Sequence, residues 1–281
     1  MRIDAHQHYW EPKRGDYDWM PPDDPVLSRR YGPADLNHQL EAAGIEGTVL
    51  VQAAATINET EYMLGLADAT DTILGVVGWV NFEDRGDLKH LERLAKHPKF
   101  LGVRPMIQDI PDLDWMLRDD IQWAFEALID LDLTFDALGF PKHLENFRTI
   151  LTRYPKLRAV IDHCMKPEIR DGEFDVWAAG IERIAKDTEA MCKFSGLVTE
   201  AADHWTVEQL KPYADHVLSV FGPTRIMWGS DWPVCRLRTE YAQWLSSAQT
   251  LTEHFSSEER DAIFGGTAQR FYRLKPPKPD E

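Results

Sequence analysis

The chain has few cysteines, no long apolar run and a shortage of basic residues. Among its 281 residues are three cysteines, Cys164, Cys192 and Cys235, whose odd number and wide spacing exclude a disulfide framework and a CxxC zinc or redox site. No apolar stretch approaches the roughly 20 residues needed to span a bilayer, so we expect no membrane association. The N-terminus enters a strand-like segment without an apolar signal, which predicts a cytoplasmic protein.

The charge balance excludes a further class of partner. Lys and Arg number 31 against 47 Asp and Glu, which gives a formal net charge of -16. General nucleic-acid binders need clustered Lys and Arg to replace counterions, so we expect no nucleic-acid partner. No feature of the sequence indicates the oligomeric state. Tryptophan is plentiful, with ten residues, which indicates either aromatic walls around a ligand or a large core.

Short apolar runs alternate with amphipathic helical stretches along the chain. The runs predict eight strands, at 3–5, 48–51, 73–80, 100–103, 133–135, 159–161, 191–194 and 226–228. Helical spacers, predicted at 33–43, from 58 onward, and at 121–131, 144–154, 174–187 and 207–221, require parallel crossovers between strands. We therefore predict an α/β fold, a single-domain (β/α)8 TIM barrel over 1–274 with a disordered tail at 275–281. An open doubly wound sheet is the alternative, but no GxGxxG turn follows the first strand.

Polar residues follow three of the predicted strands where they end, at the catalytic face of a barrel. The first strand ends in His6-Gln7-His8, and strand alternation sends both imidazoles to the same side. The sixth ends in Asp162-His163 and the eighth in Ser230-Asp231. The histidines and Asp231 would form a cluster too polar for a core, suited to one divalent ion or to a substrate. Each member also has a structural alternative, such as a hydrogen-bonded core histidine or a capping aspartate.

Almost the whole chain, from 2 to 274, resembles the amidohydrolase superfamily, in its branch of lactonases that are similar to metal-dependent hydrolases. The segments that carry the resemblance are DAHQHYW at 4–10, DHCMKP at 162–167, FSGL at 194–197, GSDWP at 229–233 and FGGTA at 264–268. Within that branch, RGDY at 14–17 and VQAA at 51–54 look most like L-fuconolactonases, which open sugar lactones. The resemblance implies a hydrolase acting on a small sugar lactone, L-fuconolactone or a related 1,4- or 1,5-lactone.

The resemblance also implies a metal site. It places the usual metal ligands at His6, His8, His163 and Asp231. A binuclear member would carry a carboxylated Lys or a Glu at strand four or five and a His at the end of strand five, where this chain has Arg104 and Asp136. We therefore predict one divalent metal at most, with zinc as the expected ion. Some members of this branch work without a metal, so the resemblance is compatible with activity either with or without the ion.

Opening a lactone needs an activated water and stabilisation of negative charge on the carbonyl oxygen. Asp231 is the predicted base, which takes a proton from water and returns it to the leaving alkoxide. The oxyanion would be stabilised either by a metal on His6 and His8 or by Arg104 and His163. Residues 9–32 predict a long loop over the site. The predicted substrate contacts are stacking rings, Trp10 and Trp232 with Trp19 and Tyr17, and hydroxyl partners, Gln52, Lys166 and Asp136.

Three other functions are compatible with such a barrel. A decarboxylase of the same superfamily would place a second His near the end of strand five, where Asp136 stands. A hydrolase of an aromatic dicarboxylate lactone would need several basic residues at the mouth, for which Arg104 and Lys166 are candidates. A barrel that binds a sugar acid without catalysis would tolerate the loss of Asp231 or His6, and this chain keeps both.

Overall fold

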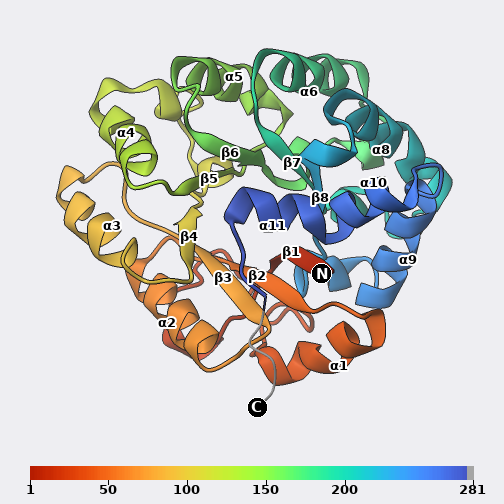
Figure 1. Ribbon diagram of the computed structural model, residues 1–281, viewed down its shortest axis with the longest axis horizontal. Coiled ribbons are helices and arrows are strands. Elements are labelled where there is room, and N and C mark those ends of the chain that lie inside the picture. Colours follow the sequence, from red (N-terminus) through yellow and green to blue (C-terminus); the bar gives the residue numbers. More distant parts are fainter. Residues whose placement is uncertain (277–281) are drawn as a thin grey trace.

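The computed structural model describes residues 1–276, which form a ring of parallel strands surrounded by helices (Figure 1). Eight strands pair in chain order, each parallel to the next. They are β1 (Ile3–Gln7), β2 (Gly47–Val51), β3 (Ile73–Gly78), β4 (Phe100–Val103), β5 (Thr134–Ala137), β6 (Arg158–Ile161), β7 (Met191–Phe194) and β8 (Ile226–Trp228). A parallel bridge between Gln7 and Trp232 links the segment after β8 back to β1. The predicted (β/α)8 barrel is confirmed.

Helices lie around the ring, and the last of them lies across one of its ends (Figure 1). They are α1 (Pro33–Ala43), α2 (Ile57–Asp68), α3 (Leu88–Leu94), α4 (Gln122–Asp130), α5 (Leu144–Arg153), α6 (Asp175–Asp187), α7 (Leu197–Glu200), α8 (Val207–Phe221), α9 (Tyr241–Leu251), α10 (Ser257–Asp261) and α11 (Thr267–Tyr272). The first begins at a proline and ends before Gly44, whose φ of 64° suits glycine. Among residues 1–276, none of these helices combines the length and apolar character needed to cross a membrane.

The start of α2 differs from its prediction. The sequence pattern at 58–61 predicts a cap there, whereas the helix begins at Ile57 and is capped by Thr56, whose hydroxyl accepts from the Glu59 N–H at 3.0 Å. The Glu59 carboxylate then accepts from the backbone N–H groups of Ala53 and Ala54 instead of closing a capping box. The helix therefore starts about one residue early, and its buried glutamate holds the segment that follows β2.

Strand boundaries also shift where polar residues find partners inside the barrel. β1 continues two residues beyond its prediction, through Gln7, whose amide donates to the Thr48 hydroxyl at 3.1 Å. β5 extends to Ala137 and so includes Asp136, which pairs with Lys193. β3 ends earlier than predicted, at Gly78. The apolar run located each strand, but hydrogen bonding across the barrel decides where each one ends.

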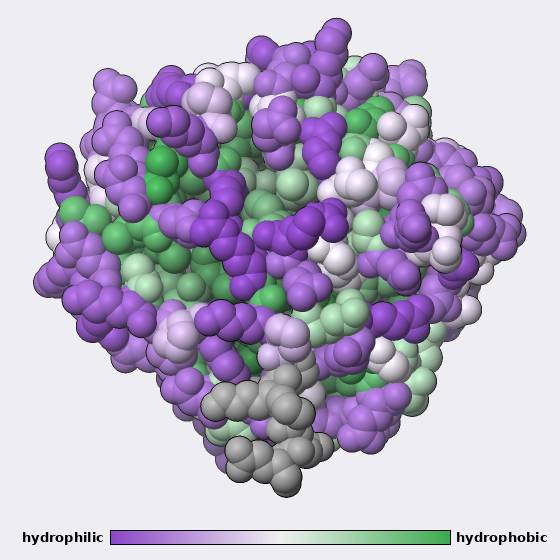
Figure 2. All heavy atoms as spheres, viewed as in Figure 1, coloured by the Kyte–Doolittle hydropathy of each residue, from purple (hydrophilic) through white to green (hydrophobic). Residues whose placement is uncertain are grey.

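The helix α11 closes the end of the barrel at which the strands begin. Figure 1 shows it lying across the middle of the ring, towards the reader, close to the N-terminus. Its Tyr272 is buried and donates to Asp136 Oδ2 at 2.7 Å. Figure 2 shows the same face, on which hydrophilic side chains predominate and hydrophobic residues appear in the hollows between them. The predicted tail at 275–281 lies, from 277 onward, outside the described residues.

Candidate functional site

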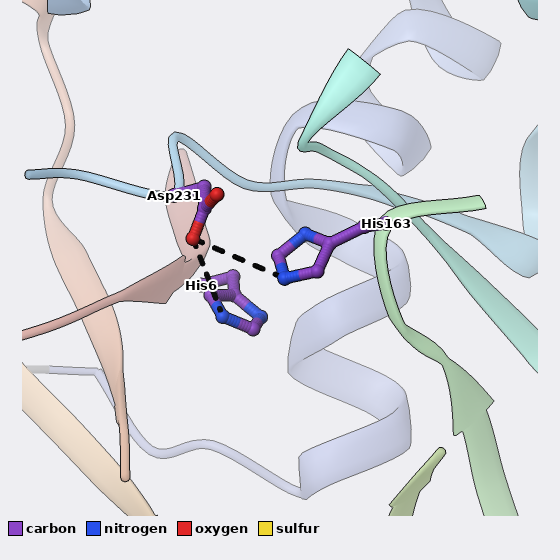
Figure 3. Close-up of side chains that lie close together, drawn as sticks. All are labelled: His6, His163 and Asp231. Carbon is purple, nitrogen blue, oxygen red and sulfur yellow. Dashed lines mark ion pairs between the residues drawn. The ribbon is translucent and has the colours of Figure 1, made fainter. Parts of the chain in front are cut away.

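Three segments meet at the carboxyl end of the barrel and aim polar side chains at one point (Figure 3). His6 comes from β1, His163 directly follows β6, and Asp231 follows β8. Asp231 Oδ1 lies 3.8 Å from His6 Nε2 and 3.9 Å from His163 Nε2. All three residues are buried, and one ligand atom from each lies within 4.8 Å of the others. Asp231 has a positive φ of 56°, a backbone conformation that is uncommon for residues other than glycine.

His8 adds a fourth polar group to this cluster. Its Nε2 lies 3.2 Å from Asp231 Oδ1 and 3.2 Å from His6 Nε2. Its Nδ1 lies 2.7 Å from the Val51 carbonyl oxygen. A carbonyl oxygen only accepts, so His8 carries a hydrogen on Nδ1, and a neutral ring then presents a lone pair on Nε2.

Arg104 supplies a buried positive charge beside the histidines. Its Nη1 lies 3.4 Å from His6 Nε2 and 3.3 Å from Asp162 Oδ2, and its Nη2 donates to the Gln52 backbone carbonyl. The Gln52 amide nitrogen donates to the Arg104 carbonyl in return, which ties the segments after β2 and β4 together. Gln52 Oε1 is buried and has no hydrogen-bond partner among residues 1–276. The guanidinium is therefore fixed in place, and Gln52 retains a free acceptor.

Lys193 is a site residue that the sequence analysis missed. It lies in β7, is fully buried, and places Nζ 2.6 Å from Asp136 Oδ2 and 3.1 Å from Asp162 Oδ1. The same nitrogen lies 3.1 Å from His6 Nδ1. A lysine inside an otherwise apolar strand was the available signal, because a buried ammonium needs paired carboxylates. Here Asp136 and Asp162, from β5 and the end of β6, provide them.

Burial and charge set the protonation of the cluster. Burial lowers the pKa of His163 to about 4. Burial, reinforced by Lys193, places the pKa of His6 well below its ordinary value. Burial acts to raise the pKa of Asp231, but His163 and His8 outweigh it, and the pKa is lowered. At neutral pH the site therefore holds neutral imidazoles around an ionised carboxylate.

The segment after β6 has an unusual backbone that aims His163 and Lys166. Four consecutive residues, His163 to Lys166, have positive φ angles of 51°, 51°, 58° and 48°. Each such residue other than glycine costs roughly 1–2 kcal/mol, so the surrounding structure must hold the turn. His163 Nδ1 contacts the Ser195 hydroxyl at 2.9 Å, and Lys166 Nζ donates to Gln108 Oε1 at 2.6 Å. Backbone strain of this kind is typical of functional sites, which indicates that the conformation of this turn is kept for function.

Comparison with known proteins identifies the family. A family model described as amidohydrolase matches residues 3–274. The chain belongs to the amidohydrolase family. This amidohydrolase is 39% identical to the L-fucono-1,5-lactonase of Burkholderia ambifaria, over 100% of this chain and 98% of the relative. It is 34% identical to the L-fucono-1,5-lactonase of Burkholderia multivorans, over 99% and 97% of the two chains.

A solved structure also aligns with the amidohydrolase over nearly its full length. It is an amidohydrolase from Burkholderia multivorans with bound zinc, 34% identical, with a TM-score of 0.91. The alignment covers 98% of this chain and 100% of that chain. The two chains therefore share the same fold over nearly their full length.

The donor set of the amidohydrolase fits one divalent ion. His8 Nε2 and Asp231 Oδ1 both accept at neutral pH, yet they lie 3.2 Å apart, an arrangement that a cation between them would satisfy. His6 and His163 bring further ring nitrogens to the same point. Imidazole nitrogen and carboxylate oxygen together are typical of zinc sites. No second group of three such residues with converging ligand atoms is found in residues 1–276.

The other residues predicted to contact the substrate lie around this cluster and differ in how deeply they are buried. Trp10 is fully buried and donates to the backbone carbonyls of the first loop, and Trp232 is 1% exposed. Asp136 contacts Lys193 and Tyr272 deep in the barrel. Ligand binding by these three residues stays a prediction, because protein atoms surround them. Trp19, in contrast, is 40% exposed.

Proposed function

We propose that this amidohydrolase opens the ring of a neutral sugar lactone, L-fucono-1,5-lactone or a related 1,4- or 1,5-lactone. The observation that carries the proposal is the buried Asp231 carboxylate set among three imidazoles, with the buried Arg104 next to one of them, His6. That arrangement provides a base for water and a cation for the developing oxyanion. The two full-length relatives that bear the name L-fucono-1,5-lactonase support the same reaction.

In the proposed mechanism, Asp231 accepts a proton from the attacking water and returns it to the leaving alkoxide. In this mechanism, which needs no metal ion, the Ser195 hydroxyl at 2.9 Å from His163 Nδ1 would donate to that nitrogen, so that the hydrogen of His163 would be on Nε2. Arg104 and His163 then stabilise the charge on the carbonyl oxygen. A zinc ion held by the cluster would polarise the carbonyl.

Substrate hydroxyls would be bound at the rim of this cluster. Gln52 Oε1 is a free acceptor, and Lys166 projects from the strained turn beside His163. Trp10 and Trp232 are the proposed stacking rings and Asp136 a proposed hydroxyl partner, each of which would require local movement to meet a ligand. Lys166 would also attract the carboxylate that forms as the ring opens.

A hollow formed by the segments that follow β1, β2, β3 and β4 favours a neutral substrate. It has a volume of about 400 Å³ and is lined by residues of these segments, among them Trp19 and Trp79. Four acidic residues, Asp16, Asp18, Glu83 and Asp109, line it, and its described lining contains no basic side chain. A dicarboxylate lactone would be repelled there. The hollow therefore supports a sugar lactone over the aromatic dicarboxylate alternative.

A panel of lactones followed with a pH indicator tests the function. The panel contains L-fucono-, L-galactono-, D-arabinono- and L-rhamnonolactones and one dicarboxylate lactone. We expect acid release from one or more of the neutral lactones, without carbon dioxide, and little from the dicarboxylate. If none of the neutral lactones released acid, the proposal would be overturned. Release of carbon dioxide from an aromatic acid would favour a decarboxylase.

A matched pair of glycine variants tests the placement of His163. Gly196 has a φ of +70°, and a Cβ there would lie 2.7 Å from His163 Cβ. Gly172 has a φ of +73° with open space around it. Gly172→Ala should lower the free energy of unfolding by about 1 kcal/mol, because alanine disfavours this backbone, and Gly196→Ala should lower it by more, because its methyl group also overlaps His163.

Only Gly196→Ala should also lower the lactonase kcat, since the added methyl group displaces His163. Urea unfolding and steady-state kinetics on both variants measure this. Equal kcat values for the two variants would show that the position of His163 does not matter.

A further inference from the structure

Glu59 lies in the first turn of α2, is fully buried, and directs its carboxyl group at the backbone of the segment that follows β2. Its Oε2 accepts from the N–H groups of Ala53 and Ala54 at 3.1 and 2.7 Å, and its Oε1 accepts from Ala53 at 3.1 Å. The helix does not need this side chain as a cap, because the Thr56 hydroxyl already caps it. Burial of an acidic group is costly, which indicates another role for Glu59.

The contacts of Glu59 with this segment do not depend on its ionisation. Burial raises the pKa of Glu59 to about 8, although the N–H groups of Ala54 and Ala53 act to lower it. Oε2 alone accepts from both N–H groups, so a hydrogen on Oε1 would leave these two bonds in place. Glu59 therefore holds the segment on either side of its pKa.

One peptide unit, between Gln52 and Ala53, connects Glu59 with the catalytic cluster. Its N–H, which belongs to Ala53, donates to Glu59. Its carbonyl oxygen, which belongs to Gln52, accepts from Arg104 Nη2. A trans peptide unit is planar and its N–H and C=O point in opposite directions, so a group that holds the N–H also sets where the oxygen lies. Glu59 thus fixes an acceptor that orients the Arg104 guanidinium.

The next peptide unit, between Ala53 and Ala54, connects Glu59 with the first loop. Its N–H, which belongs to Ala54, donates to Glu59 at 2.7 Å. Its carbonyl oxygen, which belongs to Ala53, accepts from Trp19 Nε1 at 2.6 Å. Glu59 therefore also fixes the acceptor of the indole of Trp19, a residue that lines the hollow.

The segment that Glu59 holds is itself a wall of the hollow. Residues 54–56 line it together with Trp19. The Thr56 hydroxyl donates to Asp16 Oδ1 at 3.2 Å, and Asp16 lines the hollow as well. A shift of this segment would therefore change the shape of the hollow and, through the peptide unit before it, the support of the guanidinium.

We propose that Glu59 is a positioning residue for the hydrolysis of the lactone, which holds two successive peptide units so that one orients Arg104 and the other orients Trp19. The inference rests on the proposed function for its catalytic consequence. Glu59 acts through the backbone, so its loss should affect two steps at once. Displacement of Arg104 should lower kcat, and displacement of Trp19 beside the hollow should raise KM.

Tryptophan fluorescence tests the restraint on Trp19 without any substrate. Glu59→Gln keeps one acceptor oxygen, and Glu59→Met keeps none. Acrylamide should quench Trp19 more strongly in both variants than in the unaltered protein, and most strongly in Glu59→Met. The signal of Trp19 is obtained by difference from the same proteins carrying Trp19→Phe. Unchanged quenching of Trp19 in the folded variants would overturn the proposal, whichever lactone, if any, is hydrolysed.

Steady-state kinetics with a lactone that the unaltered enzyme hydrolyses test the catalytic consequence. We expect kcat to fall by about 100-fold in Glu59→Met, the usual effect of a small misplacement of a catalytic group, and by about 10-fold in Glu59→Gln. KM should rise in both variants. A purely structural role would lower the amount of folded enzyme and leave KM unchanged, so the combined change of kcat and KM distinguishes the two roles.

The matched control is Glu61→Gln, the same change on the same helix at an exposed residue that pairs with Arg93. It should leave quenching, kcat and KM unchanged. Circular dichroism checks the fold, and Glu59→Gln alone decides if Glu59→Met does not fold. Kinetic constants of folded Glu59→Gln equal to those of the control would overturn the positioning role. If the unaltered protein hydrolyses no lactone, the proposed function fails, and the quenching result still decides whether Glu59 holds Trp19.

Discussion

Asp231→Asn should lower the lactonase kcat by about 10²- to 10⁴-fold, the usual contribution of a general base. The amide keeps an oxygen that accepts and has nearly the same shape, but it does not take a proton from water. Asparagine also tolerates the positive φ of 56° at this position, so the fold should be retained. Steady-state kinetics with L-fucono-1,5-lactone, together with urea unfolding, measure the two effects separately.

The control for Asp231→Asn is Asp203→Asn, the same chemical change at an exposed residue that pairs with Arg238. It should leave both kcat and the free energy of unfolding nearly unchanged, because surface ion pairs contribute little. The metal content of the Asp231 variant is measured alongside, since Asp231 is also a candidate ligand. Near-normal turnover in a folded Asp231→Asn protein would remove this residue from the mechanism.

Arg104→Met should produce the second large effect, a fall in kcat of about 10²- to 10³-fold with a smaller change in KM. The guanidinium is a proposed donor to the oxyanion, and loss of one such donor typically costs this much. The variant should also unfold more easily, by about 3–5 kcal/mol, because Asp162 loses one of its two buried cations. Lys193 remains to pair with Asp162 and should preserve the fold.

Arg104→Lys separates the effect of the positive charge from the effect of where the guanidinium places its donors. It keeps the positive charge near Asp162 but loses the second donor to the Gln52 carbonyl. We expect the free energy of unfolding to recover more than kcat does, since the oxyanion needs a donor at a fixed place. Turnover of Arg104→Met close to that of the unaltered enzyme would leave stabilisation of the oxyanion to His163 or to a metal.

The histidines and Asp231 could be placed at one end of the barrel from sequence because two simple rules apply to them. Parallel strands end on the same face, and residues i and i+2 of a strand share a side, so His6, His8, His163 and Asp231 had to approach one another. The aromatic residues follow no such rule. Trp10 and Trp232 are enclosed, whereas Trp19 is exposed, and residue type does not distinguish these environments.

Alternating apolar runs and helical spacers were sufficient to predict the barrel, because burial on both faces and parallel crossovers leave few other arrangements for them. The same apolar runs did not predict the charged residues inside the barrel. Lys193 looks like one polar interruption in a strand until closure of the ring sets Asp136 and Asp162 at 2.6 and 3.1 Å from it. The same lysine contacts His6, 187 positions away along the chain. The pattern of apolar residues in a segment reflects the burial of that segment and its helical or strand period. Hydrogen bonds between strands far apart in sequence exist only after the barrel has closed.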